Sequence, residues 1–408
     1  MIAEKLAKKL SEVVEDYREE MVKTLCELIR IKAISPDWGG KGELDKAEYL
    51  MKLLDGFEVQ RYDAVDERAK GGVRPNIVAK LKGRKDRRLW IVTHMDVVPE
   101  GDEKLWSTPP FEPVVKDGRV YGRGSEDNGQ SLVSSLFAAK AVMETERPEY
   151  TLCLAFVSDE ETGSKYGIQH LLKQGIFKKD DVFVVPDAGT KDGSMIEIAE
   201  KSILWLKFIV HGRQAHASMP HVAINAYRRA MKFLLELDEE LHKKFNARNE
   251  LFSPPTSTFE PTKREANVDN VNTIPGIDVS YMDCRILPDY SVEEVLNAVE
   301  EVKRKHEREG KIDVEVVQKE TSPPTPENSE VVKLLSKAIE LMRGIKPSLF
   351  GIGGNTCAAF FRKAGFHTAV WSTVDGMAHQ PNEYAVIENM VADAKVFAAL
   401  PYPTYLKG

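Results

Sequence analysis

The sequence has little of what marks a secreted, membrane-bound or disulfide-rich protein. Only four of its 408 residues are cysteine, and no two form a C-x-x-C pair, which argues against a zinc ribbon or a disulfide framework. Its longest apolar runs, such as residues 152–157, are far shorter than the ~20 residues of a membrane span. Residues 1–20 mix both charge signs and lack the apolar centre of a signal peptide. We therefore expect a cytoplasmic protein without a membrane partner.

Strong charge of either sign is also missing. The 57 Lys and Arg residues against 64 Asp and Glu give a net charge of −7, which suits the phosphate backbone of a nucleic acid poorly. Hydrophobic residues make up 42% and charged residues 30%, an ordinary balance for a folded protein. A chain of 408 residues exceeds one ordinary hydrophobic core, so we expect two domains.

The order of the predicted strands and helices indicates an α/β domain with a second domain inserted in it. Strands and helices alternate over residues 1–197, which predicts a mixed, largely parallel sheet. Residues 198–320 follow a β-α-β-β-α-β order, typical of a ferredoxin-like α+β domain. Residues 321–408 return to the α/β pattern and complete the first domain. The predicted strands are 76–81, 89–98, 152–157, 182–185, 203–211, 278–286, 314–317 and 367–372, and the predicted helices are 1–30, 44–54, 131–143, 167–174, 223–241, 292–309, 328–343 and 387–399.

Side chains that can carry chemistry follow the predicted strands at the points where those strands end. His94 and Asp96 form an H-x-D pair, and because alternate residues of a strand share a face, the Asp96 carboxylate can orient the His94 ring. Acidic residues 159–161 follow another strand, Asp187 ends the next, and His379 lies in a loop after the last. Functional groups of such sheets lie just beyond the carboxyl ends of the strands.

Each of these residues also has an ordinary structural explanation. Asp127, which precedes a predicted helix, is a common N-cap residue, although Gly122, Gly124 and Gly129 around it favour an unusual backbone conformation. Three consecutive carboxylates are most simply a solvated loop, and they would repel one another if buried without cations. Taken together, two histidines and at least three carboxylates at one sheet edge suit a pair of divalent cations, each with an open position for water.

The motifs, in their order along the chain, resemble the M20 metallopeptidases and amidohydrolases. This family includes acetylornithine deacetylase, succinyl-diaminopimelate desuccinylase, carnosinase-like dipeptidases and glutamate carboxypeptidase. The resemblance extends from the N-terminal helix to His379. It is carried by THMDVVP (93–99), DGRVYGRGSED (117–127), SDEETGS (158–164), VVPDAG (184–189), GRQAHASMP (212–220), NTIPG (272–276), DCRILP (283–288) and AHQPNE (378–383).

The resemblance implies a centre with two Zn²⁺ ions per subunit, which Co²⁺ or Mn²⁺ could replace. By position in the motifs, His94 and Asp187 would bind one ion, Glu161 and His379 would bind the other, and Asp127 would bridge the two.

The same resemblance implies how the centre acts. Glu160, the first of the Glu pair, would be the general base for the attacking water, and Asp96 would support His94. The peptide bond after the bridging carboxylate, Asp127–Asn128, would be cis.

The insertion resembles the family's lid and dimerisation domain, which implies a homodimer. His216 would reach into the active site of the partner subunit and stabilise the oxyanion, although a hydrogen-bonded lid histidine with a purely structural role is the simpler alternative. Asn272 and Arg285 would hold the substrate, with the Arg285 guanidinium binding its carboxylate through two hydrogen bonds. Gly354, in GIGGNT (351–356), would belong to the substrate-side loop.

The implied enzyme is a zinc-dependent hydrolase of the amide bond in N-acyl amino acids, of deacetylase or desuccinylase type. A dipeptidase or metallocarboxypeptidase acting on short peptides is the alternative, and a catalytically silent binding protein of the same fold is the third possibility. Related aminopeptidases lack the insertion. Two departures from the family leave the substrate open. Asn-Gly-Gln follows Asp127 where many relatives have a hydrophobic residue, Lys and Gly, and GIGGNT stands where amidohydrolase relatives often have Gly-Gly-Thr-Asp.

Overall fold

The computed structural model describes residues 2–406, which form two compact units. The larger unit contains the chain up to Ile198, Thr325–Leu349 and the residues from Thr356 on. The smaller unit contains Ala199–Pro324 and Phe350–Asn355.

The segment Phe350–Asn355 lies in the smaller unit, whereas the sequence placed it in the first domain. Its partners explain the difference, because the backbone N–H of Gly351 donates to the carbonyl of Leu251 (2.6 Å). The N–H of Lys201 donates to Ile352 (3.0 Å), and the Asn355 side chain returns a hydrogen bond to the Lys201 carbonyl (3.2 Å). These contacts join residues that are far apart in the chain, so a local sequence pattern does not predict them.

The N-terminal region is two helices where the sequence predicted one. Helix α1 (Ile2–Asp16) ends at a turn, and α2 (Arg18–Arg30) begins directly after Tyr17. The Tyr17 ring packs against Phe137, with ring centroids 5.1 Å apart. This contact with a buried aromatic residue holds the turn against the core, which the apolar periodicity alone does not reveal.

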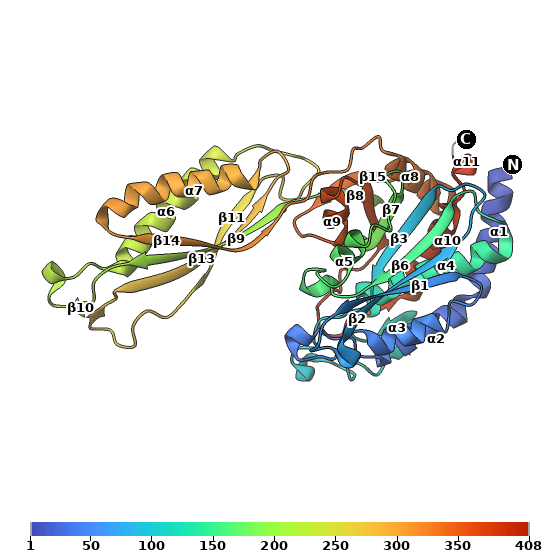
Figure 1. Ribbon diagram of the computed structural model, residues 1–408, viewed down its shortest axis with the longest axis horizontal. Helices are drawn as coiled ribbons and strands as arrows, with labels where there is room; N and C mark the ends of the chain where they lie inside the picture. The colour runs from blue at the N-terminus through green and yellow to red at the C-terminus, as the bar shows by residue number, and fades with distance from the viewer. Residues whose placement is uncertain (1, 407–408) are drawn as a thin grey trace. The chain divides into compact units, whose positions relative to one another are not determined.

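An eight-stranded mixed sheet has the order β1-β2-β6-β3-β7-β16-β8-β15 and forms the centre of the larger unit, except that the last residues of β8 and β15 are assigned to the smaller unit (Figure 1). The neighbouring strands β6, β3, β7 and β16 run parallel to one another, whereas β1, β2 and β8 pair antiparallel with their neighbours. The predicted mixed sheet is therefore confirmed, and its parallel strands form the middle. Their carboxyl ends meet at one edge, where residues that follow them come together. The strands are Glu58–Val65, Val73–Leu81, Thr151–Val157, Arg88–His94, Val182–Thr190, Thr368–Thr373, Met195–Glu200 and Ser348–Ile352, in sheet order.

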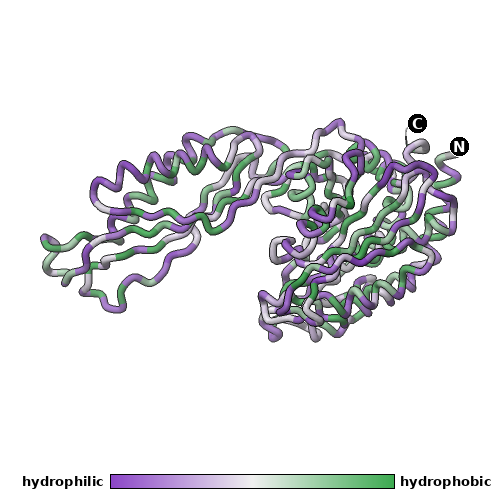
Figure 2. The backbone as a smooth tube through the Cα atoms, viewed as in Figure 1, coloured by the Kyte–Doolittle hydropathy of each residue, from purple (hydrophilic) through white to green (hydrophobic). Residues whose placement is uncertain are grey.

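Helices cover both faces of this sheet. On one face, α4 (Ser131–Thr145) contacts β3 and β6, α8 (Glu330–Arg343) contacts β7, and α10 (Ile387–Ala399) contacts β16. On the other, α5 (Ile168–Lys173) and α9 (Cys357–Lys363) join a cluster that includes Trp90 and Phe183. All seven residues of β3 are buried, as expected for a parallel strand covered on both faces. The hydrophobic runs show as green stretches along these strands in Figure 2.

Shorter elements complete the larger unit. Helix α3 (Leu44–Met51) packs against β2, and α11 (Pro403–Leu406) contacts α8. A small three-stranded sheet has the order β17-β5-β4, with bounds Tyr384–Val386, Arg119–Tyr121 and Val114–Lys116. Across the described residues, no helix is both long and apolar enough to cross a membrane.

The smaller unit has the β-α-β-β-α-β order that the sequence predicted. Its strands pair antiparallel in the order β11-β13-β9-β14, and α6 and α7 contribute to the same hydrophobic core, which includes Phe208, Phe233 and Val299. Burial alternates along β13, so one face of the sheet is apolar and the other more exposed. Helix α7 begins at a capping box of Ser291 and Glu294. The elements are β9 Ser202–His211, β10 Ala215–His216, α6 Ala226–Lys244, β11 Thr258–Arg264, β12 Thr273–Ile274, β13 Ile277–Ile286, α7 Val292–His306 and β14 Ile312–Glu320.

Candidate metal centre and active site

The first group of candidate ligands comes from two neighbouring parallel strands and the loop before α4. His94 is the last residue of β3, Asp187 lies in β7, and Asp127 lies just before α4. The His94 Nε2 atom is 2.9 Å from Asp127 Oδ1 and 3.3 Å from Asp187 Oδ1. Their ligand atoms lie within 4.8 Å of one another.

The second group shares Asp127 with the first. His379, in the loop after β16, places Nε2 3.2 Å from Asp127 Oδ2 and 3.1 Å from Glu161 Oε2. Glu161 follows the end of β6. Each oxygen of Asp127 therefore faces a different histidine, which is the arrangement of a carboxylate that bridges two cations.

These distances fit a pair of divalent ions. Ligands about 2.1 Å from a tetrahedral zinc lie ~3.4 Å from each other, close to the 2.9–3.3 Å separations between the histidine and carboxylate atoms. The Oε1 atom of Glu161 is buried without a hydrogen-bond partner. Within residues 2–406, no Lys or Arg forms an ion pair with Asp127, Asp187 or Glu161. The residues that the sequence predicted as ligands thus meet in two groups with the donor set that zinc prefers.

The electrostatics of the site show the same demand for positive charge. Burial works to lower the pKa of His94, but Asp187 and Asp127 raise it well above its ordinary value. Hydrogen bonds to Asp127 and Glu161 raise the pKa of His379 to about 10. Burial, and then the charge of Asp127, raise the pKa of Glu161 to about 7. In the absence of metal ions, the negative charge of the carboxylates favours the protonated forms of the two histidines and of Glu161. Binding of metal ions to these residues therefore releases protons.

Glu160 stands apart from the ligand groups in its contacts. Its carboxylate accepts no hydrogen bond from the described residues, although its backbone is fixed in the loop after β6. Burial, and then the negative charge of Asp187, raise its pKa well above the ordinary value. A half-buried carboxylate with a raised pKa and no hydrogen-bond partner among the described residues is suited to accept a proton from water.

Asp96 contacts both the His94 ring and the loop that follows β6. The His94 ring Nδ1 lies 3.0 Å from the backbone carbonyl of Asp96, whereas the nearest carboxylate oxygen of Asp96 is 3.6 Å away. That carboxylate accepts hydrogen bonds from the backbone N–H groups of Glu160 (3.1 Å) and Glu161 (3.0 Å). The Asp96 carboxylate therefore lies beside the His94 ring, where the H-x-D spacing placed it, and it also holds the loop after β6.

Asn128 is a residue whose contribution the sequence analysis missed. Its side-chain amide donates to Asp187 Oδ1 (2.8 Å) and to the carbonyl of Pro186 (2.9 Å), so it orients a candidate ligand. Gln130, two residues on, donates to the carbonyl of Thr373 at the end of β16 (2.7 Å). The Asp127–Asn128 peptide bond is cis, as the resemblance implied. The Asn-Gly-Gln segment was noted in the sequence as a departure from the family. The residues that Asn128 and Gln130 bind belong to two other strands, so the sequence did not reveal their role.

The remaining predicted site residues lie in the smaller unit, where they form two groups. His216, in β10, and Asn272, directly before β12, are exposed neighbours, with Asn272 Nδ2 3.5 Å from His216 Nε2. The Arg285 guanidinium donates two hydrogen bonds to Asp283 (2.7 and 3.0 Å) and one to the Gly353 carbonyl (3.0 Å), beside Gly354. Asp283 thus fixes one edge of the guanidinium and leaves N–H donors on the other.

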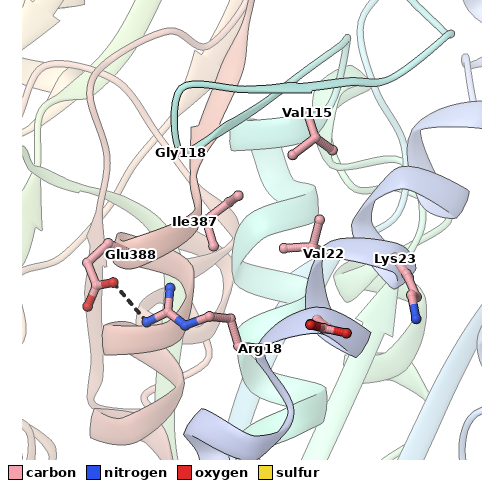
Figure 3. A pocket seen from close by; sticks show the side chains of 8 residues that line it. Arg18, Val22, Lys23, Val115, Gly118, Ile387 and Glu388 are labelled. Atoms are coloured by element: carbon pink, nitrogen blue, oxygen red, sulfur yellow. Dashed lines mark hydrogen bonds and ion pairs between the residues drawn. The ribbon is translucent and has the colours of Figure 1, made fainter.

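Two cavities in the larger unit differ in their relation to these ligands. A cavity of about 200 Å³ adjoins Asp127 and Asp187, and no Lys or Arg is among its lining residues: Glu126, Asp127, Asn128, Pro186, Asp187, Ala188, Gly189, Ser372, Val374, Gly376 and Ala378. A cavity of about 490 Å³ lies between α2, the β4–β5 turn and the start of α10, bordered by the Arg18–Glu388 ion pair (Figure 3). The larger cavity contains none of the predicted site residues, so the smaller one is the candidate substrate pocket.

Comparison with known proteins finds a matching family, close relatives in sequence and structures of similar fold. The sequence profile described as "Peptidase family M20/M25/M40" matches residues 90–402. An uncharacterized metallohydrolase of Methanocaldococcus jannaschii is 44% identical over 406 residues, which cover 94% of this chain and 98% of that protein. A tripeptidase structure from Staphylococcus aureus has a TM-score of 0.75 at 17% identity, covering 96% of this chain and 99% of its own. Human carnosine dipeptidase 1 has a TM-score of 0.72 at 18% identity, covering 98% and 99%.

The two solved structures are too distant in sequence to establish more than the shared fold. The profile match over most of the chain and the archaeal relative carry the stronger conclusion. This chain belongs to peptidase family M20/M25/M40 and is a metal-dependent hydrolase.

Proposed function

We propose that this enzyme hydrolyses the amide bond of N-acyl amino acids with two Zn²⁺ ions per subunit. The observation that carries the proposal is the pair of ligand groups that share Asp127, with one histidine facing each of its oxygens. His94 and Asp187 would hold one ion, and Glu161 and His379 the other. Co²⁺ or Mn²⁺ would fit the same nitrogen and oxygen donors.

The protein's own residues account for the proton transfers of the reaction. The bound ions would supply Lewis acidity, which polarises the amide carbonyl and lowers the pKa of water. Glu160 takes a proton from the attacking water, whose oxygen bonds to the carbonyl carbon. As the C–N bond breaks, Glu160 returns that proton to the leaving amine, and the products are a carboxylic acid and a free amino acid. The Glu160 carboxylate is half-buried, has no hydrogen-bond partner among the described residues and has a raised pKa, and these three properties support this role.

Substrate binding in this proposal depends on the smaller unit. Arg285 binds the substrate carboxylate through the N–H donors that Asp283 and Gly353 leave free, beside Gly354. His216 and Asn272 act on the oxyanion and the substrate from the partner subunit of a homodimer. Both side chains are exposed and lie next to each other, which suits a role outside their own unit's core.

An apolar stripe on the smaller unit supports the homodimer. Tyr227, Met231 and Leu235 are exposed and follow one another at four-residue spacing on α6. Residues four apart share a helix face, so the three form one continuous apolar strip. We propose that this strip is covered by a second copy of the chain.

The cavity beside the candidate ligands limits which acyl group the substrate can carry. Its volume is about 200 Å³, and no basic side chain lines it. A succinyl group would bring a second carboxylate beside Asp127 and Asp187 without a lysine or arginine to pair with it. The cavity therefore favours a small neutral acyl group such as acetyl.

The alternative function is a dipeptidase or carboxypeptidase. A dipeptide would place its ammonium group in the same cavity, where the carboxylates favour a cation. The tripeptidase and carnosine dipeptidase structures have the same fold as this chain.

An assay of matched substrates decides between these functions. The Zn²⁺-loaded enzyme would be given N-acetyl-, N-succinyl- and N-glycyl forms of the same amino acids, and the released amino acid would be measured by chromatography. We expect kcat/KM for N-acetyl substrates to exceed that for N-succinyl substrates by at least about tenfold. Preference for the glycyl dipeptides would replace this proposal with the dipeptidase. No cleavage with Zn²⁺, Co²⁺ or Mn²⁺ would point to a silent binding protein.

A further inference from the structure

Two buried glutamates next to the candidate centre are absent from the ligand set and from the proposed reaction. Glu126 precedes the bridging Asp127 and is 4% exposed. Its Oε1 atom accepts a hydrogen bond from the backbone N–H of Asp375 (2.6 Å). Its Oε2 atom accepts hydrogen bonds from the N–H groups of Met377 and Ala378. All three donors belong to the loop that carries His379.

Glu383 makes the opposite connection. It follows His379 by four residues and has no exposed surface. Its Oε1 atom accepts hydrogen bonds from the backbone N–H groups of Glu126 (2.9 Å) and Asp127 (3.0 Å). Its Oε2 atom accepts from the N–H of Gly124 (3.0 Å) and from the Arg123 guanidinium (2.7 Å). Glu383 therefore binds the loop that carries Asp127.

We propose that Glu126 and Glu383 form a reciprocal clasp that fixes the separation of Asp127 and His379 before metal ions bind. Each glutamate belongs to one ligand-bearing loop and binds backbone amides of the other. Both act as positioning residues, because they reach the ions only through the ligands. The clasp rests on the proposed metal centre, since its purpose is to preset that centre.

The physical case begins with the cost of burying these carboxylates. A buried carboxylate without partners is strongly disfavoured, and here each one is satisfied almost wholly by backbone N–H groups of the opposite loop. A shift of either loop would leave both the amides and the carboxylate unpaired, so the two loops are held in one relative position.

The backbone of His379 gives a second reason for the clasp. Its φ of 63° lies in the left-handed region, which non-glycine residues adopt at a cost when the surroundings hold them there. The two residues immediately before it, Met377 and Ala378, are fixed by the hydrogen bonds that their backbone N–H groups donate to Glu126. The Arg123 guanidinium also donates toward the His379 carbonyl (3.4 Å), so Arg123, four residues before Asp127, adds a further contact to the loop of His379.

Substitution of Glu126 and substitution of Glu383 should weaken metal binding in different ways. Glu126 holds the loop of His379, which belongs to one ligand group only, so Glu126→Gln would weaken chiefly the ion bound by Glu161 and His379. Glu383 holds Asp127, which belongs to both groups, so Glu383→Gln would weaken both ions. Gln keeps the size of the side chain but turns an NH₂ group toward N–H donors that need an acceptor.

The test measures Zn²⁺ binding to the metal-free full-length enzyme by competition with a chromophoric chelator, together with elemental analysis after gel filtration. Glu388→Gln is the matched control, because the Glu388 side chain is 69% exposed and pairs with Arg18 at the surface (Figure 3). We expect the control to bind two ions like the wild type. We expect Glu126→Gln to retain one ion and to bind the second at least about tenfold more weakly, and Glu383→Gln to lose affinity for both by a similar factor.

Hydrogen exchange provides a measurement that does not depend on metal binding. If the clasp is preformed, the six amides it binds exchange as slowly in the metal-free wild type as those of β6, although they lie in loops. These amides are the N–H groups of Gly124, Glu126, Asp127, Asp375, Met377 and Ala378. In Glu126→Gln, the three amides of residues 375–378 that it binds should exchange faster while β6 is unchanged.

The possible failures are distinct. Fast exchange of the six amides in the wild type overturns the clasp, as does unchanged Zn²⁺ affinity in both variants or equal loss of both ions from Glu126→Gln. Should either variant fail to fold, the shorter Glu126→Asp and Glu383→Asp replace it, and the wild-type exchange result still decides. If the wild-type enzyme binds no Zn²⁺, the proposed function is refuted. The hydrogen-exchange measurement then tests the clasp independently of metal binding.

Discussion

Asp393, in the middle of α10, is a fully buried carboxylate whose charge makes stability depend on pH. It accepts hydrogen bonds from the backbone N–H and the hydroxyl of Thr373 (2.7 and 2.6 Å) at the end of β16. Arg343 approaches it at 3.4 Å. Burial outweighs these partners and raises the pKa of Asp393 from 3.8 to about 6.

The size and sign of the effect follow from that pKa. Between pH 3.8 and about 6 the folded protein keeps a proton on Asp393 that the unfolded chain has released. The stabilisation from this proton is therefore complete below pH 3.8 and is lost as the pH rises through about 6. The difference of roughly two pH units corresponds to about 3 kcal/mol in the free energy of unfolding.

Asp393→Asn tests this reasoning, because an asparagine resembles the protonated carboxyl and does not titrate. Urea unfolding of the wild type and the variant would be measured from pH 4 to pH 7.5. We expect the free energy of unfolding of the wild type, relative to the variant, to fall by about 3 kcal/mol over this range. Asp180→Asn, at an exposed surface ion pair with Arg87, is the control and should show a much smaller change. A difference between wild type and Asp393→Asn that does not vary with pH would refute the account.

Three further predictions concern the active site. Glu160→Ala should lower kcat by at least about 10² while the content of metal is retained, and near-normal turnover would remove Glu160 as the base. Glu160→Ala and His216→Ala subunits, each inactive alone, should recover some activity when mixed as verified heterodimers, and no recovery would argue against a site shared between subunits. Asn128→Ala should weaken Zn²⁺ binding by about tenfold, because Asp187 loses its 2.8 Å hydrogen bond, and competition with a chelator measures this directly.

The sequence located the candidate ligands well because their positions follow from a local rule. His94, Asp187 and Glu161 lie in or directly after strands whose apolar runs are easy to recognise. Parallel topology then brings the carboxyl ends of those strands to one sheet edge. The β-α-β-β-α-β insertion was equally legible, since each of its main elements has a clear period.

What the sequence could not show depends on partners that are distant in the chain. The turn at Tyr17 rests on Phe137, and the place of residues 350–355 rests on Leu251 and Lys201. Local periodicity carries no record of such contacts. Such contacts become visible only in the folded structure, because the residues that form them are far apart in the sequence.

The same limit applied to the supporting residues of the site. The H-x-D spacing correctly placed Asp96 near His94, yet the carboxylate binds the amides of Glu160 and Glu161. The glutamates of the clasp gave no signal at all. Glu126 and Glu383 looked like ordinary acidic residues until the two loops were seen together.

Anomalous diffraction from crystals of the active, Zn²⁺-loaded enzyme, recorded at the zinc absorption edge, tests the central claim most directly. The account predicts two zinc peaks per subunit, one held by His94 and Asp187 and the other by Glu161 and His379, with Asp127 between them. A fully active crystal with no zinc, or with zinc bound only at other residues, would contradict it.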